Sequence, residues 1–221
     1  MYFRQLLTTA LVCAVSALAS AGTIVVDVRD PKAVPLADAV VYAAPEGREM
    51  APASRTAVMD QKNKTFVPRV LPVQVGTAVK FPNSDDIQHQ VYSFSPAKTF
   101  NLPLYKGTPA NPIVFGAPGV VTLGCNIHDT MNAYIVVVET PYFEKTEASG
   151  RVELRNLPAG KYVVRVWHPD MKDEPAQQIV TVSESERPEL AFTVIAAPKA
   201  MTTTPSNKIE DKFKKYGHGR P

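Results

Sequence analysis

The stretch GVVTLGCNIHDTMNAYIVVV, residues 119–138, places a short polar loop between two apolar runs of strand length. Both runs are rich in β-branched side chains, which favours strands. The loop between them holds Cys125, His128 and Met131 within seven residues. Because a loop between two strands can turn its side chains toward one point, the pattern predicts that a thiolate, an imidazole and a thioether cluster together.

These donor types narrow the choice of metal. Thiolate and thioether sulfur favour copper(I), and imidazole serves both copper oxidation states. Two histidines and one cysteine in a plane, with a weak axial methionine, form the blue-copper arrangement, so the loop lacks one histidine. His89 is the natural supplier, because it follows the turn cluster 83–88, whereas His168 and His218 lie in later parts of the chain. We therefore predict one copper ion bound by His89, Cys125, His128 and Met131.

The N-terminus predicts an exported protein. After a basic start, an apolar stretch runs from Leu6 to Leu18 and leads to the small-x-small site Ala19-Ser20-Ala21. We expect a signal peptide over residues 1–21, a periplasmic location and no stable membrane insertion, because the apolar stretch is shorter than a membrane span. Cleavage removes Cys13 and leaves Cys125 alone. A lone thiol in an oxidising compartment needs burial or a metal.

The composition favours an all-β protein. Twenty prolines against eleven glycines, together with short alternating runs, indicate many turns between strands. A net charge of +3 is too small to argue for a nucleic-acid partner. We expect residues 95–112, which are rich in proline, to form a long irregular connection with room for only short elements. Strands are expected over residues 23–28, 39–43, 65–68, 70–75, 79–81, 90–94, 113–115, 119–124, 133–138, 150–154, 161–167, 178–182 and 189–195.

The central part of the chain resembles the cupredoxin family, which includes plastocyanin, pseudoazurin and amicyanin. The Cys-x2-His-x2-Met spacing is similar to the short amicyanin loop, and the whole chain resembles periplasmic cupredoxin-like proteins labelled methylamine utilization proteins. The resemblance implies a cupredoxin Greek-key β-sandwich or barrel over residues 57–139. It rests on Thr65-Phe66-Val67-Pro68, Val75-Gly76-Thr77-Ala78-Val79-Lys80-Phe81, Asn83 placed six residues before His89, and the loop from Cys125 to Met131.

The resemblance also implies how electrons would pass. The ring edge of His128 would be the exit, surrounded by apolar loop residues. The implied partners are exported redox proteins such as a c-type cytochrome or a periplasmic dehydrogenase. Gln90 and Ile127 depart from the small polar residue and the proline that many cupredoxins have at these positions. Such positions affect hydrogen bonds around the sulfur, which tune the reduction potential.

The segments on either side resemble a carboxypeptidase-regulatory-like β-sandwich. The likeness rests on Pro35 to Val41, Gly150 to Leu154 and Leu157 to Tyr162. We therefore expect a second β-sandwich, with the cupredoxin stretch inserted into it. The predicted division is a signal peptide at 1–21, first strands and link at 22–56, the cupredoxin domain at 57–139, the remaining strands at 140–198 and a disordered tail at 199–221.

Other polar residues have simpler interpretations. His168 has no cluster of partners in the sequence, so we expect a structural or surface role for it. Asp85, Asp86 and Asp129 are expected to be solvated acids in turns, since their neighbours are soft donors rather than oxygen ligands. The sequence has no Ser-His-Asp signature, paired catalytic carboxylates or phosphate-binding glycine loop.

Three functions compete. The first is a carrier of single electrons and not an enzyme, because four such ligands fill the copper coordination sphere and leave no position for a substrate. The second is copper storage or delivery, which the soft ligands fit equally well. The third is a metal-free adhesion or scaffold protein, for which the flanking sandwich would be the working part.

Overall fold

The computed structural model describes residues 21–171, 175–184 and 186–195. The tail predicted at 199–221 and nearly all of the predicted signal peptide lie outside the described residues. Every regular element in the described part is a strand, and this part holds no helix that could cross a membrane. The predicted all-β class is therefore confirmed.

The strands of the described residues are short and numerous, as the proline-rich composition predicts. They are β1 (Gly22–Arg29), β2 (Val40–Pro45), β3 (Thr56–Val58), β4 (Asp60–Lys62), β5 (Thr65–Val67), β6 (Val70–Gln74), β7 (Ala78–Lys80), β8 (His89–Ser95), β9 (Lys98–Tyr105), β10 (Ile113–Val114), β11 (Gly119–Gly124), β12 (Asn132–Val138), β13 (Phe143–Lys145), β14 (Arg151–Leu157), β15 (Gly160–Trp167), β16 (Ala176–Val182) and β17 (Glu189–Thr193).

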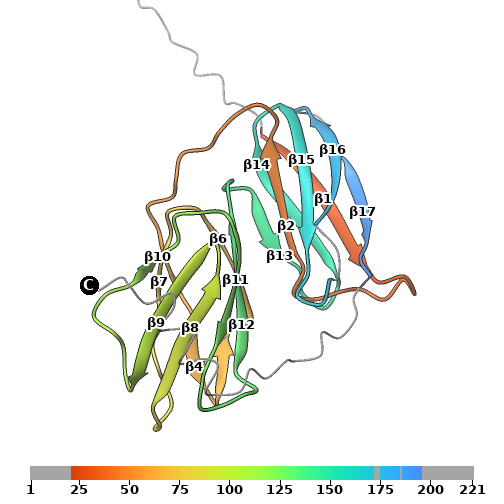
Figure 1. Ribbon diagram of the computed structural model, residues 1–221. Coiled ribbons are helices and arrows are strands. Elements are labelled where there is room, and N and C mark those ends of the chain that lie inside the picture. The colour runs from red at the N-terminus through yellow and green to blue at the C-terminus, as the bar shows by residue number, and fades with distance from the viewer. Residues whose placement is uncertain (1–20, 172–174, 185, 196–221) are drawn as a thin grey trace, which may run out of the picture.

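The strands from β3 to β12 surround one hydrophobic core (Figure 1). A five-stranded sheet has the order β6-β12-β11-β8-β9, a three-stranded sheet the order β10-β7-β3, and β4 and β5 form a hairpin. Most neighbours are antiparallel, but β6 pairs with β12 in parallel, as β3 does with β7. Buried side chains of this core include Phe81, Phe115, Leu123 and Ile135. We call it the central core.

The first two strands and the strands after β12 surround a second hydrophobic core. Here a three-stranded sheet with the order β14-β1-β17 faces a four-stranded sheet with the order β13-β2-β15-β16 (Figure 1). Segments far apart in the sequence meet in it, since β1 pairs with β14 and β17, and β2 with β15. Its buried side chains include Ile24, Val41, Leu154 and Val164. We call it the flanking core.

Strand β12 contacts both halves of the molecule, which explains its unbroken apolar run. Ala133, Ile135 and Val137 belong to the central core, while Val136 and Val138 belong to a third cluster that includes Val40 of β2. A strand buried on both faces has no need for alternating polar residues. The arrangement fixes the strand that follows the Cys125 loop against a neighbouring sheet.

The expectation of an irregular crossing over residues 95–112 is wrong for its first half. Lys98–Tyr105 form β9, which pairs antiparallel with β8. Proline is tolerated there because β9 is an edge strand and Pro103 lies where its register with β8 shifts, outside the paired residues. This strand matters for the site, because its last residue, Tyr105, lies opposite His89.

Candidate metal centre

Three of the four predicted donors meet at one end of the central core. His89 is the first residue of β8, and Cys125 directly follows β11. Because β8 and β11 are neighbouring strands, with Gly124 opposite Tyr92, their ends bring the two residues together. His128 lies in the loop to β12. One ring nitrogen of each histidine and the Cys125 sulfur all lie within 4.8 Å of one another.

The separation of the Cys125 sulfur and the His128 nitrogen suits a single metal ion. Cys125 Sγ and His128 Nδ1 are 4.0 Å apart, and the rings of His89 and His128 have centroids 4.9 Å apart at an interplanar angle of 64°. Bonds of about 2.3 Å to sulfur and about 2.1 Å to nitrogen, as zinc makes, bridge donors up to about 4.4 Å apart. The sulfur and the His128 nitrogen can therefore reach one ion as they stand.

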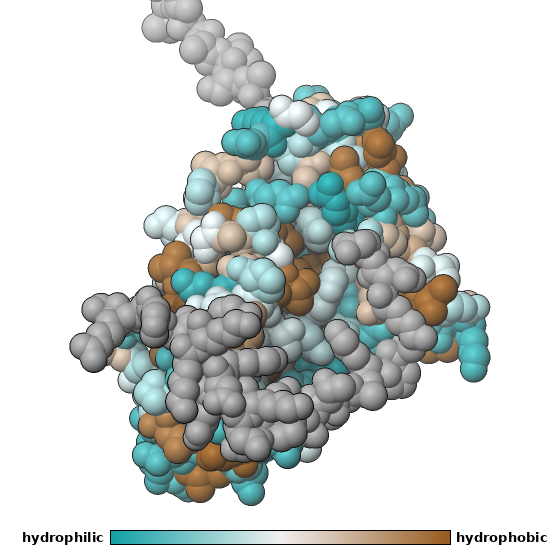
Figure 2. Space-filling view, in the orientation of Figure 1, coloured by the Kyte–Doolittle hydropathy of each residue, from teal (hydrophilic) through white to brown (hydrophobic). Residues whose placement is uncertain are grey.

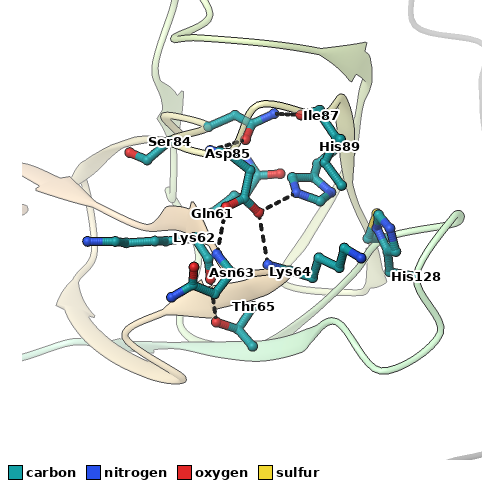
Figure 3. A network of polar contacts seen from close by, with 12 residues as sticks. Gln61, Lys62, Asn63, Lys64, Thr65, Ser84, Asp85, Ile87, His89 and His128 are labelled. Atoms are coloured by element: carbon teal, nitrogen blue, oxygen red, sulfur yellow. Dashed lines mark hydrogen bonds and ion pairs between the residues drawn. The ribbon is translucent and has the colours of Figure 1, made fainter.

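His89 offers one free nitrogen toward this cluster. Its side chain is fully buried, and its Nε2 lies 2.8 Å from Asp85 Oδ2 (Figure 3). Its Nδ1 is buried and has no hydrogen-bond partner. An unpaired buried nitrogen costs about 1–3 kcal/mol, so the position calls for a bound group. The residues present therefore fit a metal ion.

Cys125 and Met131 lie in the central core. Their exposed fractions are 4% and 2%, and Cys125 is a free cysteine. The Met131 N–H donates to the His128 carbonyl at 2.9 Å, which closes the loop into a turn. Burial protects the thiol and places both sulfur side chains in an apolar environment, but the role of Met131 as an axial ligand stays a prediction.

His128 is the part-exposed member of the cluster. Burial lowers the pKa of its ring, and the neighbouring His89 and Lys64 lower it further, against the opposing charge of Asp85. A lowered pKa keeps the imidazole neutral near pH 7, which is the form that binds metals. The preceding residue, Ile127, is 48% exposed.

The expectation that Asp85 is a solvated turn acid is wrong. Its side chain is only 14% exposed. It accepts hydrogen bonds from the backbone of Asn63 at 2.6 Å and Lys64 at 2.8 Å, besides the contact with His89. The bond from Lys64, with those from His89 and Asn63, lowers the pKa of Asp85 despite partial burial. Asp86 and Asp129 are exposed, as expected.

Asn83 organises the loop that carries Asp85. Its side-chain amide is buried and donates to the carbonyls of Ile87 and Tyr105, and its Oδ1 accepts from the Asp85 N–H. The turn cluster is therefore tied to the end of β9. The sequence shows Asn83 and Asp85 close before His89, but it gives no sign that Asp85 reaches the β4–β5 hairpin.

Apolar surface gathers at the same end of the molecule, as the lower part of Figure 2 shows. Three large apolar side chains there are exposed by 39%, 47% and 48%. They come from the loop before β8, from β9 and from the loop after β11. These are Ile87, Leu104 and Ile127.

No family model matches the chain, and no curated protein matches it. Among solved structures, it is similar to a novel purple cupredoxin from Nitrosopumilus maritimus, with 23% identity over 37% of this chain and 99% of that one, at a TM-score of 0.33. A reduced mutant of amicyanin gives 22% identity over 44% and 99%, at 0.35. A Cu-containing nitrite reductase from Thermus scotoductus SA-01 gives 25% over 53% and 28%, at 0.36. These neighbours are cupredoxins and a copper enzyme.

Proposed function

We propose that this chain is a periplasmic type 1 copper protein that carries single electrons between exported redox partners. The observation that supports it most directly is the buried, unpaired Nδ1 of His89, which lies beside a free thiol and a second imidazole. A thiolate with two imidazoles is the equatorial donor set of blue-copper sites. Bound copper would supply one-electron oxidation and reduction.

The proposed ligands are a nitrogen of each histidine, the Cys125 sulfur and the Met131 thioether. Their positions suit electron transfer because the site is built on strand ends and a short turn. His89 and Cys125 are buried against neighbouring strands, so their side chains have little freedom to rearrange. A donor set that stays fixed in both oxidation states lowers the cost of moving one electron.

Four protein donors leave no position for a substrate, unlike a catalytic metal site, which keeps one open. We therefore propose a carrier rather than an enzyme. The partly exposed His128 is the proposed electron exit, and the exposed Ile87, Leu104 and Ile127 would form an apolar contact surface around it. Partners would be exported redox proteins such as a c-type cytochrome or a periplasmic dehydrogenase.

The test is the visible and electron paramagnetic resonance spectrum of the purified chain with copper(II), followed by voltammetry. We expect an intense thiolate-to-copper band, stoichiometric with the protein, and reversible one-electron cycling. A chelator-treated sample is the control. A colourless protein that holds only copper(I) and releases it to an acceptor would instead mean storage or delivery. Absence of copper binding would contradict both and favour a scaffold.

Export is tested separately by the mass of the chain isolated from its native host. A chain that begins at Gly22 in the periplasmic fraction supports the proposal. A chain that keeps Met1 and stays with the membrane would show an anchor instead.

A further inference from the structure

The tip of the β4–β5 hairpin has an unusual backbone. Residues Lys62 and Thr65 pair across it, so Asn63 and Lys64 form a two-residue turn. Both have positive φ, 55° and 57°, which is the signature of a type I′ turn. Asparagine tolerates left-handed backbone, but for Lys64 this conformation is costly. The surroundings must therefore favour this conformation.

The carboxylate of Asp85 favours this turn. The Asn63 N–H donates to Oδ1 at 2.6 Å, and the Lys64 N–H donates to Oδ2 at 2.8 Å. Successive backbone amides in a turn can form a concavity that holds an anion, and here the anion is the side chain of a residue 21 positions away. Each oxygen of Asp85 thus receives one backbone hydrogen.

The same carboxylate decides which nitrogen of His89 carries the proton. An ionised carboxylate only accepts hydrogen bonds, so the 2.8 Å contact requires a hydrogen on His89 Nε2. The neutral ring then has its lone pair on Nδ1, the buried atom without a partner. A ligating histidine commonly donates its other N–H to such a group, which fixes tautomer and ring orientation.

We infer that Asp85 is a positioning residue for the metal centre: held by the amides of the hairpin tip, it orients His89 and presents its Nδ1 as a ligand. The inference rests on the proposed metal site. The inference assigns a role to the β4–β5 hairpin, because this hairpin reaches both histidines. Through Asp85 it holds His89, and the Lys64 side chain extends toward His128 (Figure 3).

The first experiment needs no metal. Nitrogen-15 NMR of the full, metal-free chain reports which His89 nitrogen is protonated and how fast that hydrogen exchanges. We expect a slowly exchanging hydrogen on Nε2. Asp85→Ala should speed its exchange and mix the two tautomers. Asp86→Asn is the matched control, because it removes an equal charge from the next, exposed residue and should leave the His89 hydrogen unchanged.

The second experiment measures copper(II) and copper(I) affinities by competition. Loss of such a partner lowers metal affinity about 10- to 100-fold, and we expect this for Asp85→Ala. Losing a negative charge should weaken copper(II) more than copper(I), and each tenfold difference raises a one-electron potential by about 59 mV. Asp85→Asn, which keeps one acceptor oxygen, should rescue part of the affinity and still raise the potential.

The outcomes separate the inference from the proposed function. If Asp85→Ala and Asp86→Asn give the same His89 exchange and the same affinities, Asp85 only anchors the hairpin and the inference is overturned. If the wild-type chain binds no copper, the proposed function fails, while the exchange data still decide whether Asp85 orients His89. Should Asp85→Ala not fold, Asp85→Asn carries the same comparison with Asp86→Asn.

Discussion

Two buried histidines, one beside each core, differ in how their ring nitrogens are paired. His168 is 5% exposed and has a partner for both ring nitrogens: Nε2 lies 3.1 Å from the Ala37 carbonyl, and Nδ1 accepts the Asp170 N–H at 3.2 Å. His89 is also buried, but its Nδ1 has no partner. The hydrogen bonds of His168 are consistent with a purely structural role, whereas the unpaired Nδ1 of His89 calls for a bound group.

The groups around the two rings support the same distinction between a ligand and a structural residue. Around His89 lie a thiol and a second imidazole within ligand distance. Around His168 lie backbone groups and the Met171 sulfur, which accepts the backbone N–H of His168. Burial lowers the pKa of His168, as it lowers that of the proposed ligand His128, so a shifted pKa alone does not distinguish a ligand from a structural residue. The unpaired nitrogen of His89, together with the thiol and the second imidazole beside it, does distinguish them.

The largest effect is expected when the thiolate of the proposed metal centre is removed. Cys125→Ser should abolish the visible band completely, because the thiolate is the charge-transfer partner. A buried hydroxyl in place of the thiol costs about 1–3 kcal/mol of folding stability, so circular dichroism must first show that the variant is folded. A folded variant that keeps the intense band would contradict the assignment of Cys125.

The next effect separates the two histidines directly. His89→Ala should remove high-affinity copper binding, because it deletes an equatorial donor. His168→Ala should leave copper affinity unchanged but lower the free energy of unfolding by about 1–3 kcal/mol, since it leaves the Ala37 carbonyl and the Asp170 N–H without their partner. Competition assays and urea unfolding measure both. Equal loss of copper in the two variants would remove the distinction between the two rings.

The same contrast shows what the sequence can predict. Period-two patterns and turn residues locate most strands, and the donor types in the loop after β11 identify Cys125 and His128, which do converge with His89. Strand β9 escapes such reasoning, because the prolines of the segment hide an edge strand in which Pro103 lies at a break in the pairing with β8. A single sequence shows composition, but not which strand lies at an edge.

Asp85 escapes sequence reasoning for a related reason. In the sequence it is one acid among several in a turn, and acids in turns are usually solvated. Its role depends on the hairpin tip 21 and 22 residues earlier folding over it. Contacts between two loops depend on how the sheets pack, which local patterns do not encode. His89 can be predicted because its chemistry, rather than its position, singles it out.

A smaller effect concerns the fourth proposed ligand. Met131→Leu should keep copper and colour, because an axial thioether tunes such a site more than it holds it. The apolar leucine side chain in place of a donor should disfavour the more highly charged copper(II), so the reduction potential should rise. The swap nearly conserves volume, so stability should fall by less than about 1.5 kcal/mol. An unchanged potential in voltammetry would remove Met131 from the ligand set.

The smallest effect compares two hydrogen-bonded tyrosine hydroxyls, one in each half of the molecule. Tyr105 donates to the Phe81 carbonyl at 2.7 Å and accepts from the Gln61 amide, while Tyr162 donates to the Pro158 carbonyl at 2.9 Å. Burial raises the pKa of Tyr105 from 10.0 to about 12, although the hydrogen bond from Gln61 opposes the rise. Burial also raises the pKa of Tyr162.

A raised tyrosine pKa has a definite sign in stability. Between pH 10 and about 12 the unfolded chain releases the Tyr105 proton while the folded chain keeps it, so stability falls as pH rises through this window and is fully present below it. Tyr105→Phe should cost about 1 kcal/mol at pH 7 through the lost hydrogen bonds. That deficit should shrink in urea unfolding of the metal-free chain from about pH 10 upward. Tyr162→Phe is the matched variant in the flanking half, and a deficit for Tyr105→Phe that stays constant from about pH 7 to about pH 11.5 would show that its hydroxyl titrates alike in both states.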